Sequence, residues 1–272
     1  MSEQKTWFIT GASRGFGRIW TEAALRRGDK VAATARDPNA LNDLVETYGE
    51  AVLPLRLEVT DREQVFASVR RAHQHFGRLD VILSNAGYGY VGAIEEASID
   101  DIRQNFETNV FGTLSVMQAA IPLLRAQGSG HILTVSSIGG IVGFSTGGSY
   151  VATKFAVEAL TEALAGEVAG FGIKVTIVEP GSFRTEFRAS TKAAPPMPEY
   201  DAVRTAVYAS FKPEMAGNPH ATAAAILELV DSDNPPLRLL LGSRSLPLIK
   251  QVYAGRIATW EKWADVSNAA QG

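Results

Sequence analysis

The chain has 272 residues, of which 46 % are hydrophobic and 20 % charged, as is typical of a globular protein. Its net charge of −3 excludes the broad basic field that recruits nucleic acid or an anionic membrane. The lack of cysteine excludes disulfides, thiolate metal sites and a cysteine nucleophile. The first residues do not resemble a secretory signal, and no window is long and apolar enough to span a bilayer, so we expect a soluble, cytoplasmic protein.

Short apolar segments of strand length alternate along the chain with longer segments of helical spacing. The predicted strands are 6–10, 30–35, 52–59, 79–84, 131–136, 174–179 and 237–241. The predicted helices are 14–27, 61–76, 98–126 and 149–169. Strands that are apolar on both faces and alternate with helices are typical of a parallel sheet covered on two sides. We therefore predict one α/β domain over 1–272, with a Rossmann-type doubly wound, seven-stranded, mostly parallel sheet and helices on both faces.

Residues 183–218 interrupt this alternation, because the segment and its end hold prolines at 195, 196, 198, 213 and 219 with apolar residues between. We interpret the segment as a partly helical lid and not as a second domain. In doubly wound folds the ligand binds at the carboxyl ends of the strands. A lid inserted after the sixth predicted strand is therefore expected to close the substrate pocket.

Three glycines follow the first predicted strand, in the segment Thr10-Gly11-Ala12-Ser13-Arg14-Gly15-Phe16-Gly17. Gly11 permits a tight turn, Gly15 lets the backbone approach a phosphate, and Gly17 allows close packing of helix on strand. The helix that begins here offers unpaired N–H groups and a positive dipole end. A glycine-rich turn without a ligand is the alternative. Its position at the first strand–helix junction favours dinucleotide binding, with Ser13, Arg14 and Phe16 as further contacts.

The residues after the second predicted strand bear on which dinucleotide binds. NAD sites usually place a carboxylate there for the ribose 2′-hydroxyl, whereas here Ala35 is followed by Arg36. Together with Arg14, Arg36 suits a 2′-phosphate, so we favour NADP(H). Two alternatives stay open: both arginines are solvated surface charges, or a register slip of two residues supplies Asp37 to NAD(H).

Tyr150 and Lys154 are four residues apart and share one face of a predicted helix. An ammonium beside a phenol favours the phenolate, which predicts that the pKa of Tyr150 lies below its usual value of about 10. Ser137 follows a predicted strand, and its hydroxyl suits stabilisation of charge on a carbonyl oxygen. The alternative is a solvated helix face, because Glu158 continues the stripe. The opposite stripe is apolar and consists of Val157, Leu160, Leu164 and Val168.

These features together resemble the short-chain dehydrogenase/reductase family, in its single-domain NADP-preferring branch. The matching residues are Thr10-Gly11-x-x-x-Gly15-x-Gly17, Asn85-Ala86-Gly87, Asn109, Ser137, Tyr150-x-x-x-Lys154 and Pro180-Gly181. The likeness runs from residue 6 to about 185 and more weakly to 242. It implies an NADP(H)-dependent oxidoreductase that interconverts a carbonyl and an alcohol by direct hydride transfer to carbon, without a metal.

The resemblance also implies a role for each matching residue. Tyr150 is the acid/base, Ser137 polarises the carbonyl, and Lys154 lowers the pKa of Tyr150 and holds the ribose of the nicotinamide. Asn109 holds a water in a proton relay to Lys154. The other implied cofactor contacts, beyond the glycine turn and Arg36, are Glu58, Val59, Asn85, Ala86, Gly87, Pro180, Gly181 and Thr185. The family commonly has Asp in place of Glu58, which is equally interpreted as a helix-entry charge.

The segments that border the expected pocket are mostly apolar. Substrate contacts are predicted for Ser137, Tyr150, Tyr88, Phe144, Phe183 and Phe187, with Tyr90, Ile141, Val142 and Met197 as further wall candidates. These apolar side chains indicate that the substrate is an apolar ketone, aldehyde or secondary alcohol, with steroids or retinoids as the largest candidates. The alternative is that several of these residues belong to the core.

Two other functions stay open. A dinucleotide-sensing regulator without catalysis usually lacks one of Ser137, Tyr150 and Lys154, and a sugar-nucleotide epimerase usually has a larger substrate domain.

No metal is expected, because the four histidines are not at metal-ligand spacing. The resemblance suggests a homodimer or homotetramer through 98–126 and 149–169. Trp260 and Trp263 are interpreted as packing residues or an oligomer contact.

Overall fold

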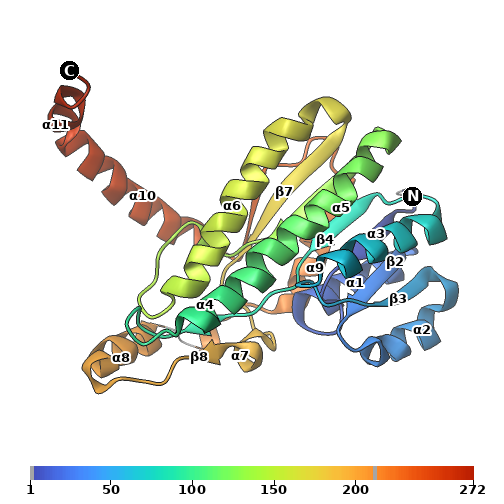
Figure 1. The fold of residues 1–272 in the computed structure, drawn as a ribbon, viewed down its shortest axis with the longest axis horizontal. Helices are drawn as coiled ribbons and strands as arrows, with labels where there is room; N and C mark the ends of the chain where they lie inside the picture. Colours follow the sequence, from blue (N-terminus) through green and yellow to red (C-terminus); the bar gives the residue numbers. More distant parts are fainter. Residues whose placement is uncertain (1–2, 211–212) are drawn as a thin grey trace.

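The structure is a computed structural model that describes residues 3–210 and 213–272. A seven-stranded sheet with the order β3-β2-β1-β4-β6-β7-β9 forms its centre (Figure 1). The strands are β1 (Thr6–Ile9), β2 (Lys30–Ala35), β3 (Val52–Arg56), β4 (Val81–Ser84), β6 (Gly130–Val135), β7 (Ile173–Pro180) and β9 (Arg238–Leu241). Every neighbouring pair is parallel, so the predicted doubly wound sheet is confirmed.

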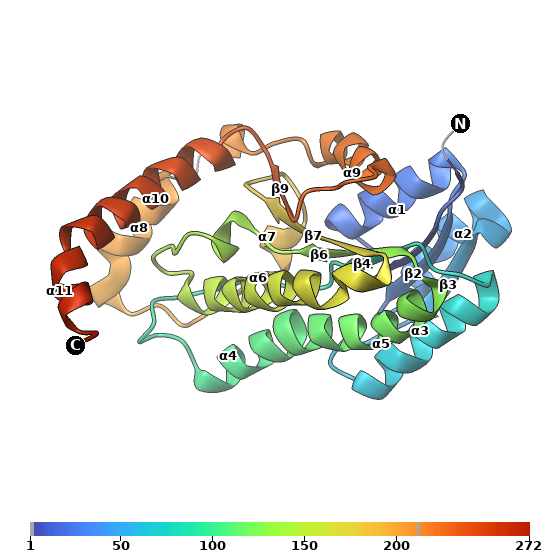
Figure 2. The same cartoon turned by 90° about the horizontal axis from the view of Figure 1, so that it is seen from above.

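Helices cover both faces of the sheet, as Figure 2 shows from above. On one face lie α1 (Gly15–Arg27), α2 (Asn42–Tyr48) and α9 (Thr222–Asp231), and on the other α3 (Arg62–Phe76), α5 (Gly112–Gln127) and α6 (Gly148–Val168). Successive strand residues point to opposite faces. Trp7 and Ile9 therefore enter the core under α1, whereas Phe8 enters the core under α3 and α5.

Two predicted elements differ from the structure. The strand expected over 52–59 ends at Arg56, because its neighbour β2 ends at Ala35, the residue paired with Arg56. The helix expected over 98–126 consists of α4 (Ile99–Phe106), a π-helical turn (Glu107–Phe111) and α5. Single π turns inside helices often occur at functional sites, and this one carries Asn109.

The predicted lid contains α7 (Phe187–Ser190), β8 (Lys192–Ala193) and α8 (Asp201–Ser210). Residues 211 and 212, which also belong to that prediction, lie outside the described residues. β8 pairs in parallel with β5 (Tyr90–Val91), forming a two-stranded ribbon that the sequence did not predict. The ribbon joins the lid to the segment that follows β4.

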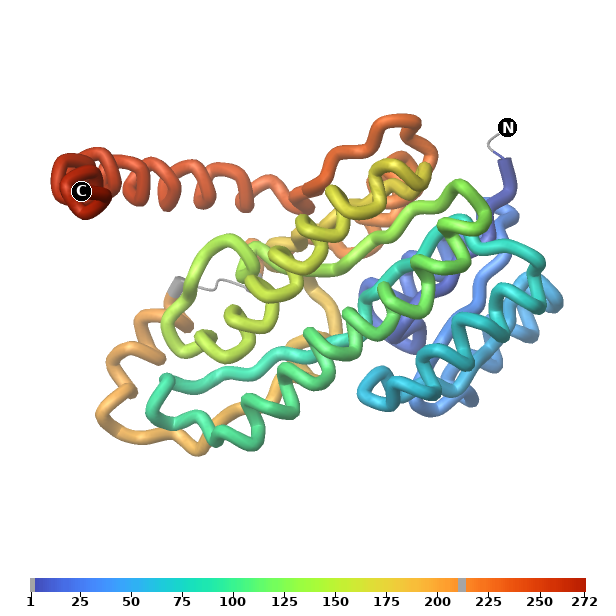
Figure 3. The backbone as a smooth tube through the Cα atoms, turned by 45° about the horizontal axis from the view of Figure 1, so that its top comes forward, coloured from blue at the N-terminus to red at the C-terminus, as the bar shows by residue number. Residues whose placement is uncertain are grey.

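The chain ends in α10 (Ser245–Lys262) and α11 (Ala264–Ala269), which extend away from the sheet (Figure 3). Trp260 and Trp263 are 63 % and 58 % exposed there, so the interpretation as packing residues within the chain is wrong. Their role as an oligomer contact stays a prediction. Within 3–210 and 213–272, no helix has the length and apolar character needed to cross a membrane.

Candidate active site

The glycine turn lies between the end of β1 and the start of α1. Gly11 and Gly15 have φ values of 69° and 57°, in the left-handed region that glycine adopts without steric cost. A Cβ atom on Gly17 would collide with the carbonyl oxygen of Gly11 and lie 2.5 Å from Nδ2 of Asn85. Only glycine fits at position 17, because the helix packs directly on the turn.

Hydrogen bonds connect the ends of β1 and β4 beside this turn. The hydroxyl of Thr10 accepts from the backbone amides of Asn85 at 2.9 Å and Ala86 at 3.0 Å. Nδ2 of Asn85 in turn donates to the carbonyl oxygen of Thr10 at 2.9 Å. The segment Asn85-Ala86-Gly87 is therefore fixed against the glycine turn.

The first turn of α1 already has an anionic partner. The backbone amide of Gly15 donates to Oε2 of Glu186 at 3.1 Å. A cavity of about 200 Å³ lies beside this contact, and its lining includes Ser13, Arg14, Arg18, Arg184, Thr185 and His220. Because a carboxylate occupies the place where helix N-termini bind phosphate, the turn fits the phosphates of a dinucleotide.

Sequence reasoning missed Glu186, although it directly follows the predicted cofactor contact Thr185. No local spacing indicates that it reaches Gly15. A carboxylate next to a predicted cofactor residue is the one signal that could have drawn attention to it.

Ser137 and Tyr150 meet at the carboxyl end of β6. Oγ of Ser137 accepts from the backbone amide of Gly139 at 3.1 Å, which fixes the turn after the strand. A Cβ atom on Gly139 would lie 3.5 Å from that Oγ and 3.7 Å from Cε1 of Tyr150. Burial raises the pKa of Tyr150 to about 12, and a hydrogen bond with Ser137 opposes the rise.

The expected lowering of the Tyr150 pKa is therefore wrong for the protein without a cofactor. Nζ of Lys154 lies 5.8 Å from the centroid of the Tyr150 ring, and it donates to the carbonyl oxygen of Val135 at 2.9 Å. At this distance the effect of the ammonium on the phenol does not outweigh burial. The phenol is protonated at neutral pH.

Lys154 is itself buried, with 6 % of its surface exposed, and so is Glu158 one turn later. The interpretation of this stripe as a solvated helix face is therefore wrong. Burial lowers the pKa of Lys154 to about 8, and the charge of Glu158 opposes that change. Val157 on the opposite stripe is also buried, so α6 is enclosed on two sides.

Asn109 is held between two segments of the site. Its Nδ2 donates to the carbonyl oxygen of Tyr88 and to the hydroxyl of Thr153, both at 3.0 Å. Its Oδ1 accepts from the amide of Tyr88 at 3.0 Å. A Cβ atom on Gly87 would lie 2.9 Å from Oδ1 of Asn109 and 3.8 Å from Nζ of Lys154, so these residues are neighbours.

Two arginines of the predicted 2′-phosphate site are exposed and unpaired. Among the residues that the structure describes, the guanidinium groups of Arg14 and Arg36 have no ion pair or hydrogen bond, and Arg14 is bonded only through its backbone carbonyl, which accepts from the amide of Arg18 at 3.2 Å. Arg36 directly follows the end of β2 at Ala35. Asp37 instead caps the 3-10 turn Pro38–Leu41, where its Oδ1 accepts from the amide of Asn39 at 3.0 Å.

The remaining predicted cofactor residues lie at the end of β7 or in the segments that follow β3 and β7. Oε1 of Glu58 accepts from the amide of Thr60 at 3.4 Å, in the turn that leads into α3. Val59 is buried. Pro180 ends β7, the amide of Gly181 donates to the carbonyl oxygen of Leu241 at 2.9 Å, and Thr185 lies beside the glycine turn.

The predicted substrate residues separate into two places. The ring centroid of Phe187 lies 5.6 Å from that of Tyr150, and the hydroxyl of Tyr88 is buried without a partner in the described part of the chain. Phe144 lies in the loop before α6. Phe183 instead packs edge-on against Phe16 at 5.4 Å, as part of the core under α1, so the structure does not bring it to Tyr150.

A partly buried ion pair anchors the far part of the predicted lid. The side chain of Glu96, 1 % exposed, pairs with Arg204 of α8 and accepts from the amide of Met197 at 2.7 Å. The amide of Ala93 also donates to Glu96, at 2.6 Å. Sequence reasoning missed this pair, because its members are 108 residues apart.

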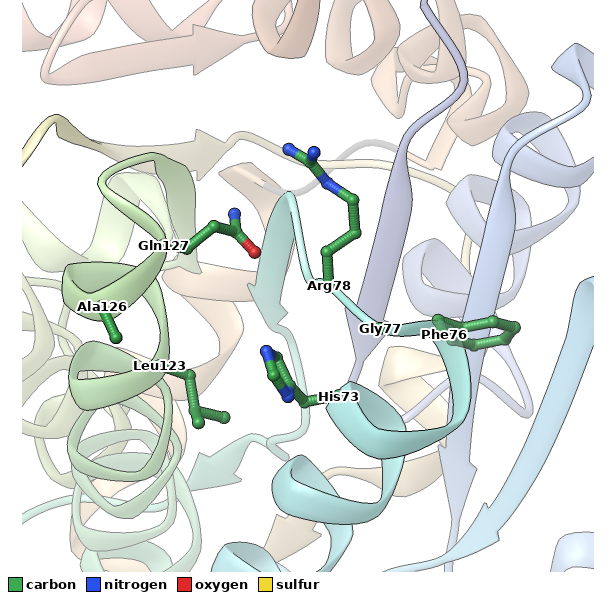
Figure 4. Close-up of a pocket in the computed structure, with 7 residues that line it drawn as sticks. All are labelled: His73, Phe76, Gly77, Arg78, Leu123, Ala126 and Gln127. Carbon is green, nitrogen blue, oxygen red and sulfur yellow. The ribbon is translucent and has the colours of Figure 1, made fainter.

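A larger cavity, about 640 Å³, lies elsewhere on the molecule (Figure 4). Its lining residues are His73, Phe76, Gly77, Arg78, Leu123, Ala126 and Gln127. They come from the carboxyl-terminal ends of α3 and α5 and from the segment before β4, at the amino ends of the strands. None of the predicted site residues lies there, so we place the active site at the glycine turn.

A doubly wound sheet whose first strand leads through a glycine turn into a helix defines a dinucleotide-binding α/β domain. The family model described as short chain dehydrogenase matches residues 5–196. The chain belongs to the short-chain dehydrogenase family and is an oxidoreductase of that family.

Curated relatives match along most of the chain. Oxidoreductase BOA17 from Botryotinia fuckeliana is 40 % identical over 271 residues, which cover 98 % of this chain and 99 % of the relative. A protein named 3-ketodihydrosphingosine reductase, from Bacteroides thetaiotaomicron, is 37 % identical over 251 residues, which cover 90 % of this chain and 89 % of the relative.

Solved structures share the fold. A short-chain dehydrogenase from Streptomyces avermitilis has a TM-score of 0.91, 39 % identity and 99 % coverage of both chains. An alcohol dehydrogenase from Thermococcus sibiricus, complexed with 5-hydroxy-NADP, has a TM-score of 0.76 and 28 % identity, with coverages of 89 % and 98 %. A short-chain dehydrogenase/reductase from Burkholderia phymatum, in complex with NAD, has a TM-score of 0.79 and 25 % identity, with coverages of 91 % and 92 %.

Proposed function

We propose that the protein is an NADP(H)-dependent oxidoreductase that interconverts a carbonyl and an alcohol, with Tyr150 as the acid/base. The observation that carries the proposal is the convergence of Ser137 and Tyr150 at Gly139, with the buried Lys154 behind them. This group lies on the same edge of the sheet as the glycine turn.

A bound nicotinamide supplies the hydride. In the reductive direction Tyr150 donates its phenolic proton to the carbonyl oxygen, and a pKa raised to about 12 keeps that proton in place at neutral pH. The hydroxyl of Ser137 donates to the same oxygen and stabilises the negative charge that develops on it. The ammonium of Lys154 favours the phenolate that remains, and Asn109 orders the proton relay to Lys154.

The preference for NADP(H) rests on Arg14 and Arg36. Both guanidinium groups are exposed and available, while Asp37 is engaged in capping its own turn. Structural neighbours hold either NADP-type or NAD cofactors, so the arginines decide our choice. We expect Arg36→Ala to raise the KM for NADPH at least tenfold, the loss of about 1.4 kcal/mol for a charged phosphate contact. The KM for NADH should not change, and Arg71→Ala on the exposed face of α3 is the control.

The substrate is proposed to be an apolar ketone, aldehyde or secondary alcohol. Phe187 from the lid lies beside Tyr150, and Tyr88 and Phe144 come from the neighbouring loops. The relative named 3-ketodihydrosphingosine reductase is consistent with an apolar ketone. The described part of the predicted lid, residues 183–210 and 213–218, would close over such a substrate and exclude water.

Consumption of NADPH across a panel of apolar and charged carbonyl compounds tests the proposal. Tyr150→Phe should lower kcat by about 100-fold or more while NADPH binding is retained. Tyr48→Phe on α2 is the matched control and should keep full activity. Equal turnover of Tyr150→Phe and the wild type would contradict the proposed role of Tyr150 as the acid/base. Turnover of charged carbonyls alone would contradict the substrate class, and cofactor binding without any turnover would favour a dinucleotide-sensing regulator.

A further inference from the structure

Helix α6 carries a second buried charge that the proposed reaction does not use. Glu158 lies one turn after Lys154, and Glu179 on β7 is 1 % exposed. Nε of Arg238, from β9, lies 3.2 Å from Oε2 of Glu158 and 3.4 Å from Oε1 of Glu179. Two buried carboxyl groups therefore share one guanidinium group, which also pairs at 2.9 Å with the exposed Glu162.

One guanidinium group cannot neutralise two buried carboxylates. Oε1 of Glu158 and Oε1 of Glu179 have no hydrogen-bond partner within the described ranges. Neighbouring carboxyl groups in a buried site do not both ionise readily, and a proton held between them gives each free oxygen a partner. Burial raises the pKa of both groups, that of Glu179 to about 8. Burial and the shared guanidinium group therefore favour one proton held between the two carboxyl groups.

The pair lies directly behind the proposed active site. A Cβ atom on Gly140 would collide with Oγ of Ser136 and lie 3.0 Å from Oε1 of Glu158, so the turn that carries Ser137 rests on this carboxyl group. The negative charge of Glu158 also raises the pKa of Lys154, against the lowering that burial causes. The charged and titratable groups around the pair are Tyr150, Lys154 and Glu162 from α6, Glu179 from β7 and Arg238 from β9.

We propose that Glu158 and Glu179, bridged by Arg238, form a positioning pair that keeps Lys154 in its charged form and supports the turn of Ser137. The inference rests on the proposed function, because that function gives Lys154 its role. Glu158 supplies the negative charge next to Lys154. Glu179 sets how much of that charge Glu158 holds, because the two compete for one proton.

The charge state of Lys154 can be measured without turnover. We propose an NMR titration of the full chain labelled with ¹³Cε-lysine, in which the Lys154 signal is assigned by its loss in Lys154→Arg. In Glu158→Gln the midpoint of Lys154 should fall by about one pH unit, because the neighbouring charge is removed. In Glu179→Gln the midpoint should rise, because Glu158 then stays ionised. Glu162→Gln, which removes an exposed carboxylate from the same arginine, should leave it unchanged.

Opposite shifts in the two variants separate a charge effect from a structural one. Shifts of the same sign, or no shift in either variant, would overturn the proposal. If Glu158→Gln does not fold, as judged by its thermal unfolding, the sign of the shift in Glu179→Gln decides alone. The alkaline limb of the kcat profile should move in the same directions. A protein that fails to reduce carbonyl compounds would refute the proposed function while the titration still tests the pair.

Discussion

The backbone amide of Gly15 donates to the carboxylate of Glu186 across 171 residues of sequence. The contact joins the first turn of α1 to the predicted lid. A helix N-terminus of this kind binds anions through the same N–H groups. If the cofactor binds as proposed, its phosphate would compete with the carboxylate of Glu186 for this donor.

Glu186→Gln should tighten NADPH binding by about fivefold, because the neutral amide neither competes as strongly for Gly15 nor repels a phosphate. The dissociation constant can be measured from the fluorescence of bound NADPH. Glu199→Gln, an exposed carboxylate elsewhere in the lid, should bind as the wild type does. Unchanged or weaker binding in Glu186→Gln would show that the contact does not compete with the cofactor.

The pH dependence of alcohol oxidation should reflect Tyr150. Because the pKa of this phenol is raised to about 12, the phenolate that accepts a proton is scarce at neutral pH. Between pH 6 and 8, below the pKa of Lys154, kcat/KM for oxidation should rise about tenfold per pH unit. Reduction uses the protonated phenol and should be nearly flat over this range. A flat oxidation profile would contradict the raised pKa.

Gly17→Ala should damage both folding and cofactor binding. The added Cβ atom collides with the carbonyl oxygen of Gly11, so the turn must move away from the helix. We expect the free energy of unfolding in urea to fall by about 1–3 kcal/mol, the cost of an overpacked site. Gly166→Ala on α6 is the control, because a Cβ atom there meets nothing within 4 Å. Wild-type stability of Gly17→Ala would contradict the packing of this turn.

His131 should make the protein less stable in acid. Burial lowers its pKa to about 3, and its Nε2 lies 3.0 Å from the hydroxyl of Thr176. In the unfolded chain His131 binds a proton as the pH falls below about 6.5, whereas in the folded protein its imidazole stays neutral until the pH reaches about 3. His131 therefore lowers the unfolding free energy by about 1.4 kcal/mol for each pH unit that the pH falls between these values.

The measurement is urea unfolding between pH 4 and 7, compared with His131→Gln. The stability of the wild type should fall relative to the variant as the pH falls. His220→Gln, which replaces an exposed histidine, is the control and should show the same dependence of unfolding free energy on pH as the wild type. Parallel curves for the wild type and His131→Gln would refute the prediction.

Much of the fold follows from local sequence patterns. Strands such as Lys30–Ala35 place apolar side chains on both faces of a sheet that helices cover on two sides. The alternation of these strands with helices determines the parallel topology. Tyr150 and Lys154 were predictable as neighbours, because four residues make one helical turn. Ser137 was placed near them because strand ends meet at one edge of the sheet.

Other features depend on contacts that no local pattern contains. Gly15 and Glu186, like Glu96 and Arg204, meet only once the lid has folded over the sheet. The π turn around Asn109 depends on its bonds to Tyr88 and Thr153. The sign of the Tyr150 pKa shift also needed the structure, because burial opposes the lysine and spacing does not report burial.

The attachment of the lid divides it into two parts with different freedom. The β5–β8 ribbon and the Glu96–Arg204 pair tie residues 192–204 to the body, and Phe183 packs against Phe16. Between them, residues 186–191 contact the body through the Glu186–Gly15 hydrogen bond and the Phe187–Tyr150 ring contact. Opening would then need the movement of a short flap, residues 186–191, and not the displacement of a whole subdomain. Substitutions in the flap should alter the rate of product release, and substitutions in the tied part should alter which molecules are accepted.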